Sequence, residues 1–304
     1  MIQMIVMTVL LLLLGGFLWW SRKSIKTTRY FYWNKALPSA LDGLRIVHLS
    51  DLQSEYFGKA QRRILEKTRA ASPDLIVFTG DLTDRNHTDY QAGITLMEGL
   101  VKIAPVYYVD GNHELALPVE EISQMYDVLE GMGVVLLRDR ATTFTKSGAP
   151  QMRLLGLSEE TIYRAKISGG ALREGEKCSR EKVSDTEIDR QLVQECIAAL
   201  LTDAGEGENA FTLLLVHEPQ FLEVYAVPGI NLIFAGHAHG GQIRLPFTQG
   251  LFAPGQGILP KLTSGMHQSG NSTMVISRGL GNSTFPFRVF NRPEIVVIQV
   301  ESQQ

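Results

Sequence analysis

Residues 80–86 read Gly80-Asp81-Leu82-Thr83-Asp84-Arg85-Asn86, and they follow directly on the apolar, β-branched run 74–79. A short run of this kind that ends in glycine is typical of a buried strand entering a tight turn. Open α/β sheets bind their ligands just beyond the carboxyl ends of strands. Asp81 therefore lies where a carboxylate can take part in chemistry.

Four more strand-like runs end at residues of metal-ligand type. Run 44–49 leads to Asp51 and Gln53, 106–109 to Asn112 and His113, 211–216 to His217, and 232–236 to His237 and His239. Any one of these residues alone is more often a cap or turn former. Five such strand ends indicate one shared site at the rim of a sheet.

The ordered motifs resemble the calcineurin-like metallophosphoesterase family. They are GDLTDRN at 80–86, GNHE at 111–114, the lone His217 and GHAH at 236–239. The segments 240–246 and 277–281 are most similar to its membrane-associated bacterial branch of YkuE-like and YaeI-like phosphodiesterases. The resemblance, from about residue 44 onward, implies an α/β (α+β) fold: a four-layer αββα sandwich of two packed sheets with helices outside.

The resemblance also implies two metal sites that share a bridging Asp81. The ligands would be Asp51, Asp81 and His239 for one ion, and Asp81, Asn112, His217 and His237 for the other. Two divalent ions about 3.5–4 Å apart can hold a phosphoryl group and turn a bridging water into an attacking hydroxide. Mixed oxygen and imidazole ligands suit manganese, iron, zinc or cobalt, and manganese is our first candidate.

Three further residues are expected to act on the substrate. In the family, the histidine equivalent to His113 helps to stabilise the transition state or protonate the leaving group, and Asp84 resembles its orienting partner. Arg85 could bind phosphate oxygens through its forked guanidinium, although a structural salt bridge is an equally good interpretation.

The chain departs from the family pattern at Gln53. The common first motif is Asp-x-His, whereas this chain has Asp51-Leu52-Gln53, so one imidazole ligand is missing. On a strand, His48 and Asp51 would point to opposite faces, so His48 is expected to be a core residue and not a substitute ligand. Gln53 can offer an amide oxygen, and we expect it to give a weaker metal site.

Residues 1–20 contain no charged side chain and are about long enough to cross a membrane as a helix. A signal peptide is the alternative, but no basic residue precedes the apolar run. Arg22, Lys23, Lys26 and Arg29 follow it, which favours a single-pass anchor in the cell membrane with the catalytic domain in the cytoplasm. We expect a juxtamembrane linker at 21–43 and one metallophosphoesterase domain at 44–304.

Apolar spacing predicts helices at 58–71, 90–103 and 185–204, and another from near Pro118 to Gly131 or Gly133. The alternation of strands and helices predicts a largely parallel sheet in the first half. Strand pairing is expected for segments such as 134–137 and 152–157, and a surface insertion for 158–184.

The resemblance implies a hydrolase that cleaves phosphoric diesters or pyrophosphates, and a lipid-linked or nucleotide-sugar molecule is one candidate substrate. The apolar loop at 251–260 would suit an amphiphilic substrate, or could be ordinary packed loop. A non-catalytic membrane-anchored binding module on a degenerate site is the alternative that Gln53 raises. The formal net charge of −3 gives no support for a nucleic acid substrate, and no protein partner can be inferred.

Overall fold

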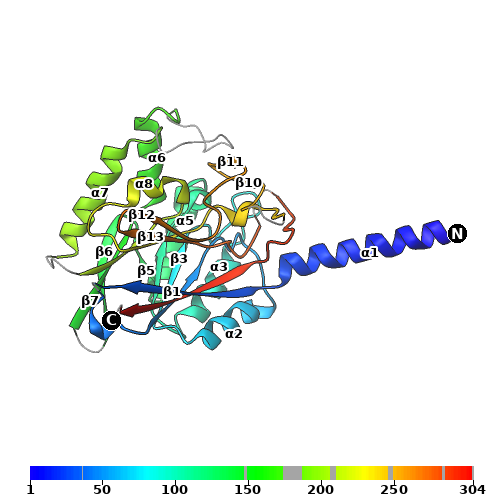
Figure 1. Ribbon diagram of the computed structural model, residues 1–304, viewed down its shortest axis with the longest axis horizontal. Coiled ribbons are helices and arrows are strands. Elements are labelled where there is room, and N and C mark those ends of the chain that lie inside the picture. Colours follow the sequence, from blue (N-terminus) through cyan, green and yellow to red (C-terminus); the bar gives the residue numbers. More distant parts are fainter. Residues whose placement is uncertain are drawn as a thin grey trace.

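The computed structural model describes residues 1–35, 37–146, 149–173, 187–205, 210–245, 249–282 and 285–302. Within this part of the chain, two six-stranded sheets pack face to face and helices cover their outer faces (Figure 1). This arrangement confirms the predicted αββα sandwich.

The first sheet carries the parallel half of the fold. Its order is β1 (Lys26–Asn34), β14 (Glu294–Ser302), β2 (Leu44–Leu49), β3 (Leu75–Thr79), β4 (Val106–Val109) and β5 (Val135–Leu136). Strands β2 to β5 are parallel, and their crossovers are the helices α2 (Arg62–Ala71), α3 (Tyr90–Leu100) and α5 (Val119–Gly131).

Both faces of this sheet are buried, which explains its continuous apolar runs. Along β3, Ile76 and Phe78 pack under the helices, whereas Leu75 and Val77 face the other sheet. This alternation follows from the two-residue period of a strand. Each such fully buried side chain contributes about 1.5–3 kcal/mol of hydrophobic free energy.

The second sheet is mixed. Its order is β12 (Gly265–Ser269), β13 (Ser272–Ile276), β9 (Leu232–Ala235), β8 (Phe211–Leu215), β7 (Ala149–Gly156) and β6 (Arg140–Lys146). Its outer face packs against α6 (Glu159–Ser168), α7 (Arg190–Asp203) and α8 (Leu222–Tyr225).

The structure differs locally from the expectations in two parts of the chain, where the strand pairing was not predicted correctly. The expected linker at 21–43 contains β1, which pairs along its whole length with β14 because its inward-facing Tyr32 is buried between the sheets. Segments 134–137 and 152–157 contribute to different sheets and do not pair with each other. The division of the chain into an anchor, a linker and a domain stays a prediction.

The expected surface insertion at 158–184 begins with helix α6, which Ser158 caps by accepting a hydrogen bond from Thr161 N. Lys166 on this helix is 1% exposed and donates to Glu218 Oε1 at 2.5 Å, so its charge is paired inside the protein. Residues 174–184 of the expected insertion, and the predicted start of a helix at 185, lie outside the described residues.

Helix α1 (Ile2–Lys23) enters the sandwich at the carboxyl ends of β2, β3 and β4. Strand β14 is antiparallel to β2 and parallel to β1, so the start of β1 lies beside the end of β2. Helix α1 is exposed, and it is long and apolar enough to cross a membrane, with a mean hydropathy of 2.3.

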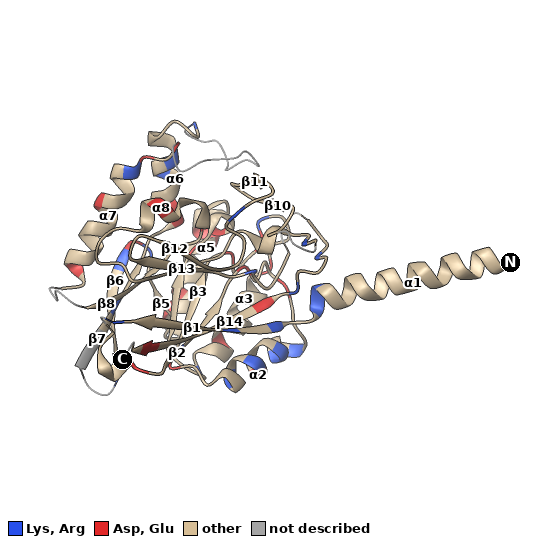
Figure 2. Cartoon of the chain, in the orientation of Figure 1, with Lys and Arg blue, Asp and Glu red and all other residues tan. Residues whose placement is uncertain are grey.

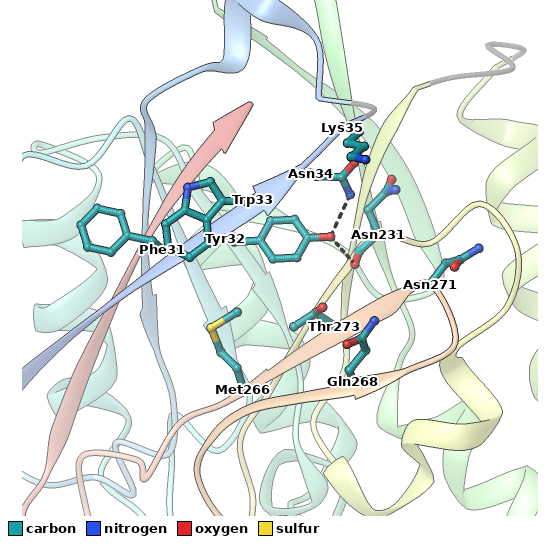
Figure 3. A pocket seen from close by; sticks show the side chains of 10 residues that line it. All are labelled: Phe31, Tyr32, Trp33, Asn34, Lys35, Asn231, Met266, Gln268, Asn271 and Thr273. Carbon is teal, nitrogen blue, oxygen red and sulfur yellow. Dashed lines mark hydrogen bonds between the residues drawn. The ribbon is translucent and has the colours of Figure 1, made fainter. Parts of the chain in front are cut away.

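The opposite end of the sandwich holds a pocket of about 610 Å³ between β1 and the β12–β13 hairpin (Figure 3). Tyr32 points into it and binds Asn231 O through its hydroxyl at 3.1 Å. The pocket lies at the end of β1, whereas the candidate ligands follow the ends of β2, β3 and β9. We call these two regions the pocket end and the ligand end.

Candidate metal centre

Four of the candidate ligands lie on turns with left-handed backbone. The φ angles are 52° for Asp51, 56° for Asp81, 64° for His237 and 46° for His239. Such angles are uncommon for residues other than glycine and cluster at functional sites. Because β2 ends at Leu49, Asp51 and Gln53 are not on a strand, and the expected alternation of faces does not extend to them.

Asp81 lies at the centre of the site and is 1% exposed. Its Oδ1 accepts a hydrogen bond from His113 N at 3.0 Å, and its Oδ2 accepts one from Gln53 Nε2 at 2.6 Å. His217 Nε2 lies 3.4 Å from the same Oδ2. Both carboxylate oxygens therefore face groups that come from other strand ends.

Two groups of buried side chains could each hold a cation, and both include Asp81. One consists of Asp81, His217 and His237, and the other of Asp51, Asp81 and His239; within each group the ligand atoms lie within 4.8 Å of one another. Asp81 is thus the one residue that the two groups have in common.

Asn112 joins the first group. Its Oδ1 lies 3.2 Å from His217 Nε2 and 3.0 Å from His237 Nδ1, and these two ring nitrogens are 3.2 Å apart. Ligand atoms around one cation with bonds of about 2.0–2.2 Å lie about 3.0–3.5 Å from one another. The other ring nitrogen of His217, Nδ1, lies 2.8 Å from Thr79 O, and this contact leaves the Nε2 lone pair for a ligand.

Unpaired polar atoms show that cations fit here. Gln53 Oε1 and His239 Nδ1 are buried, and neither has a hydrogen-bond partner among the described residues. Burial raises the pKa of Asp51 to about 6; His217 opposes this rise and the Asp81 carboxylate adds to it. A divalent cation would offset the repulsion between the carboxylates of Asp51 and Asp81.

His113, Asp84 and Arg85 lie together beside Asp81. His113 Nε2 is 3.9 Å from Asp81 Oδ2, and His113 Nδ1 is 3.4 Å from Asp84 Oδ1. Burial lowers the pKa of His113, but the carboxylates of Asp81 and Asp84 outweigh burial and leave it raised. Arg85 approaches through its backbone, since its N–H donates to His113 Nδ1 at 3.1 Å.

Glu114 organises the site and was not predicted to have a role. Its fully buried carboxylate accepts hydrogen bonds from Asp81 N and Gly111 N at 2.8 Å, and from Thr83 N at 2.9 Å and Thr83 Oγ1 at 3.1 Å. It thereby joins the turn after β3 to the turn after β4. Its place in the GNHE motif was the only signal in the sequence.

The loop at 277–281 covers Asp51 from the other side. Leu280 N and Gly281 N donate to Asp51 O at 3.2 and 2.6 Å. Gly279 has a φ of +69°, and a Cβ atom there would lie 2.7 Å from Asp51 Cβ. This glycine therefore permits the segment to approach Asp51 closely.

The remaining histidines are not part of the centre. His48 is fully buried, bonds Thr79 Oγ1 through Nε2 at 2.8 Å, and has its pKa lowered to about 3 by burial, so it is the expected core residue. His87 is exposed, and His267 Nε2 contacts Ser264 O at 3.1 Å.

Comparison with known families identifies the group to which this site belongs. The model of the calcineurin-like phosphoesterase family matches residues 44–241. The chain belongs to this family. It is therefore a hydrolase that acts on phosphoesters.

The chain is also similar to individual proteins. It is 28% identical to the uncharacterized metallophosphoesterase YkuE of Bacillus subtilis, over 91% of this chain and 86% of that protein. It is 25% identical to the phosphodiesterase YaeI of Escherichia coli, over 75% and 70% respectively. A transmembrane protein with a metallophosphoesterase domain from Danio rerio is 26% identical, over 86% of this chain and 54% of that protein.

Proposed function

We propose that this protein is a membrane-anchored metal-dependent phosphodiesterase or pyrophosphatase with two divalent cations at the ligand end. The observation that carries this proposal is that two groups of buried ligand atoms share Asp81. The similarity to a phosphodiesterase and to a transmembrane protein supports the diester substrate and the anchor.

The ligand sets follow the two groups. Asp51, Gln53, Asp81 and His239 would hold one cation, and Asp81, Asn112, His217 and His237 the other. Oxygen and imidazole ligands in this mixture favour manganese as the first metal to test, with iron, zinc or cobalt as alternatives. Gln53 would serve as a ligand with its amide turned, so that Oε1 and not Nε2 faces Asp81.

Bound cations would polarise the phosphoryl group and acidify water at the centre. His113, held between Asp81 and Asp84, would carry a proton to the leaving oxygen. Arg85, whose backbone N–H donates to this histidine, could bind the phosphoryl oxygens through its guanidinium.

The anchor would be helix α1, with the catalytic domain in the cytoplasm because Arg22 and Lys23 form its last turn. This sidedness can be tested in a variant without Cys178 and Cys196 that carries Gln268→Cys on the exposed β12–β13 hairpin. An impermeant maleimide should label lysed cells but not intact cells. Rapid labelling of intact cells would place the domain outside.

Hydrolysis of bis(p-nitrophenyl) phosphate tests the activity itself. The purified full chain is treated with a chelator and then with manganese, beside an Asp81→Asn variant. Turnover should return with the metal in the native protein and should stay about 10³-fold lower in the variant. Failure of the folded native protein with manganese, iron, zinc and cobalt would contradict the proposal.

A further inference from the structure

Three exposed phenylalanines lie in one loop beside helix α1. Phe285, Phe287 and Phe290 are 38%, 46% and 63% exposed. Phe290 contacts Phe17 of α1, with 5.3 Å between the ring centroids. The guanidinium of Arg292 lies 4.9 Å over the Trp20 ring of the same helix.

The contact with Phe17 fixes the depth of this loop. Helix α1 is apolar up to its last turn, where Arg22 and Lys23 lie (Figure 2). With a rise of 1.5 Å per residue, Phe17 lies about 7.5 Å before Arg22 along the helix, toward the apolar part. If α1 crosses a membrane with its basic end at the surface, Phe290 lies at the depth of the lipid headgroups or below.

A second loop with exposed apolar side chains is linked to the first. Ile258 is 81% exposed and Leu259 is 63% exposed at the β10 (Phe252–Ala253) and β11 (Gly257–Ile258) hairpin. Backbone hydrogen bonds link the two loops through one intervening segment. They run from Leu259 N to Leu251 O, from Leu251 N to Ile243 O and from Arg244 N to Val289 O.

Two of these exposed side chains lie on strained backbone. Phe290 has a φ of 51° and Leu259 a φ of 53°, although both are bulky residues without glycine's freedom. Such strain costs about 1–3 kcal/mol and persists only where the surrounding structure enforces it. In water alone, exposing these apolar side chains would gain no hydrophobic free energy to offset this strain.

The same loops are tied to the metal centre. Asn291, next to Phe290, donates through Nδ2 to His239 O at 2.7 Å. The buried Arg288 donates to Gly281 O and to Arg278 O, and so holds the loop that covers Asp51. Glu55, two residues after Gln53, forms ion pairs with Arg22 and Lys23.

We infer that Phe285, Phe287, Phe290, Ile258 and Leu259 form a bilayer-docking surface, which seats the ligand end against the lipid headgroups beside helix α1. The occupant is a lipid bilayer because the surface is continuous with α1. The proposal rests on the membrane anchor of the proposed function. It places the metal centre where the phosphoester of an amphiphilic substrate lies, and it gives the apolar loop at 251–260 a partner.

Spin labels in the full chain, reconstituted in phospholipid vesicles, test this surface. Nitroxides are attached singly to Phe290→Cys and Leu259→Cys in a variant without Cys178 and Cys196. Leu12→Cys reports on the anchor, and Phe31→Cys is a matched exposed aromatic position (47%) at the pocket end. The collision rates with oxygen and with a water-soluble nickel chelate are measured.

We expect labels at 12, 259 and 290 to collide mainly with oxygen, and the label at 31 mainly with nickel. If the label at 12 is in lipid while those at 259 and 290 resemble the one at 31, the docking surface is wrong and the anchor stands. If the label at 12 is itself in water, the anchor fails and the docking surface fails with it. Neither result would alter the hydrolysis of the soluble diester, which tests the chemistry separately.

Discussion

At the ligand end, aspartates and histidines are buried on strained turns, whereas at the pocket end Gln268 and Asn271 lie exposed on relaxed chain (Figure 3). Burying a carboxylate costs free energy unless a charge or hydrogen-bond donor compensates it. The difference shows that buried ligand side chains, and not the presence of a pocket, distinguish the candidate active site.

Removal of His113 should have the largest effect in this comparison. His113→Ala should lower the turnover of bis(p-nitrophenyl) phosphate by about 10²–10³-fold, because no side chain would then protonate the leaving oxygen. Metal content, measured by atomic emission, should not change. Gln268→Ala at the pocket end should leave turnover as it is, and a fully active His113→Ala variant would refute the assigned role.

Replacement of Glu114 should weaken metal binding. Three N–H groups and one hydroxyl now donate hydrogen bonds to the Glu114 carboxylate. In Glu114→Gln the amide NH₂ would face some of these donors, so the turns that carry Asp81 and Asn112 would shift. We expect manganese affinity to fall by about 10–100-fold, measured by titration calorimetry. Glu301→Gln, which alters the exposed bond to Trp33 near the other end, is the matched control and should bind manganese normally.

Two glycines with left-handed backbone allow the cost of a steric collision to be measured apart from the cost of the backbone conformation. Gly279→Ala should lower the free energy of unfolding by about 3 kcal/mol, because its Cβ would collide with Asp51. Gly270→Ala, in the β12–β13 turn, meets no atom within 4 Å and should cost about 1 kcal/mol. Equal losses in chemical unfolding would show that Gly279 is needed for its φ angle alone.

Restoring the missing imidazole should have the smallest effect. Gln53→His should tighten manganese binding by about tenfold, because a ring nitrogen would replace an amide that now donates to Asp81. Gln268→His adds the same side chain at the pocket end and should not change affinity. An unchanged affinity for Gln53→His would count against position 53 as a ligand.

The family resemblance predicted the sandwich, and the order of strand-like runs and motifs predicted that the candidate ligands would lie at one end, because these motifs are local signals in the sequence. The sequence could not place Glu114, whose four bonds come from turns that only the folded sheet brings together. The expected alternation of side-chain faces along a strand does not reach Asp51 and Gln53, because β2 ends at Leu49. The strand at 26–34 also had no signal in the sequence, since its partner strand lies at the far end of the chain.

The central claim is that Asp81 joins two cations, and electron paramagnetic resonance of the manganese-loaded full chain tests it most directly. We expect two manganese ions per chain with an exchange-coupled spectrum. In Asp81→Asn the coupling should be lost, whether or not one ion remains bound. A single ion per chain in the native protein, or two ions with uncoupled spectra, would contradict the shared centre.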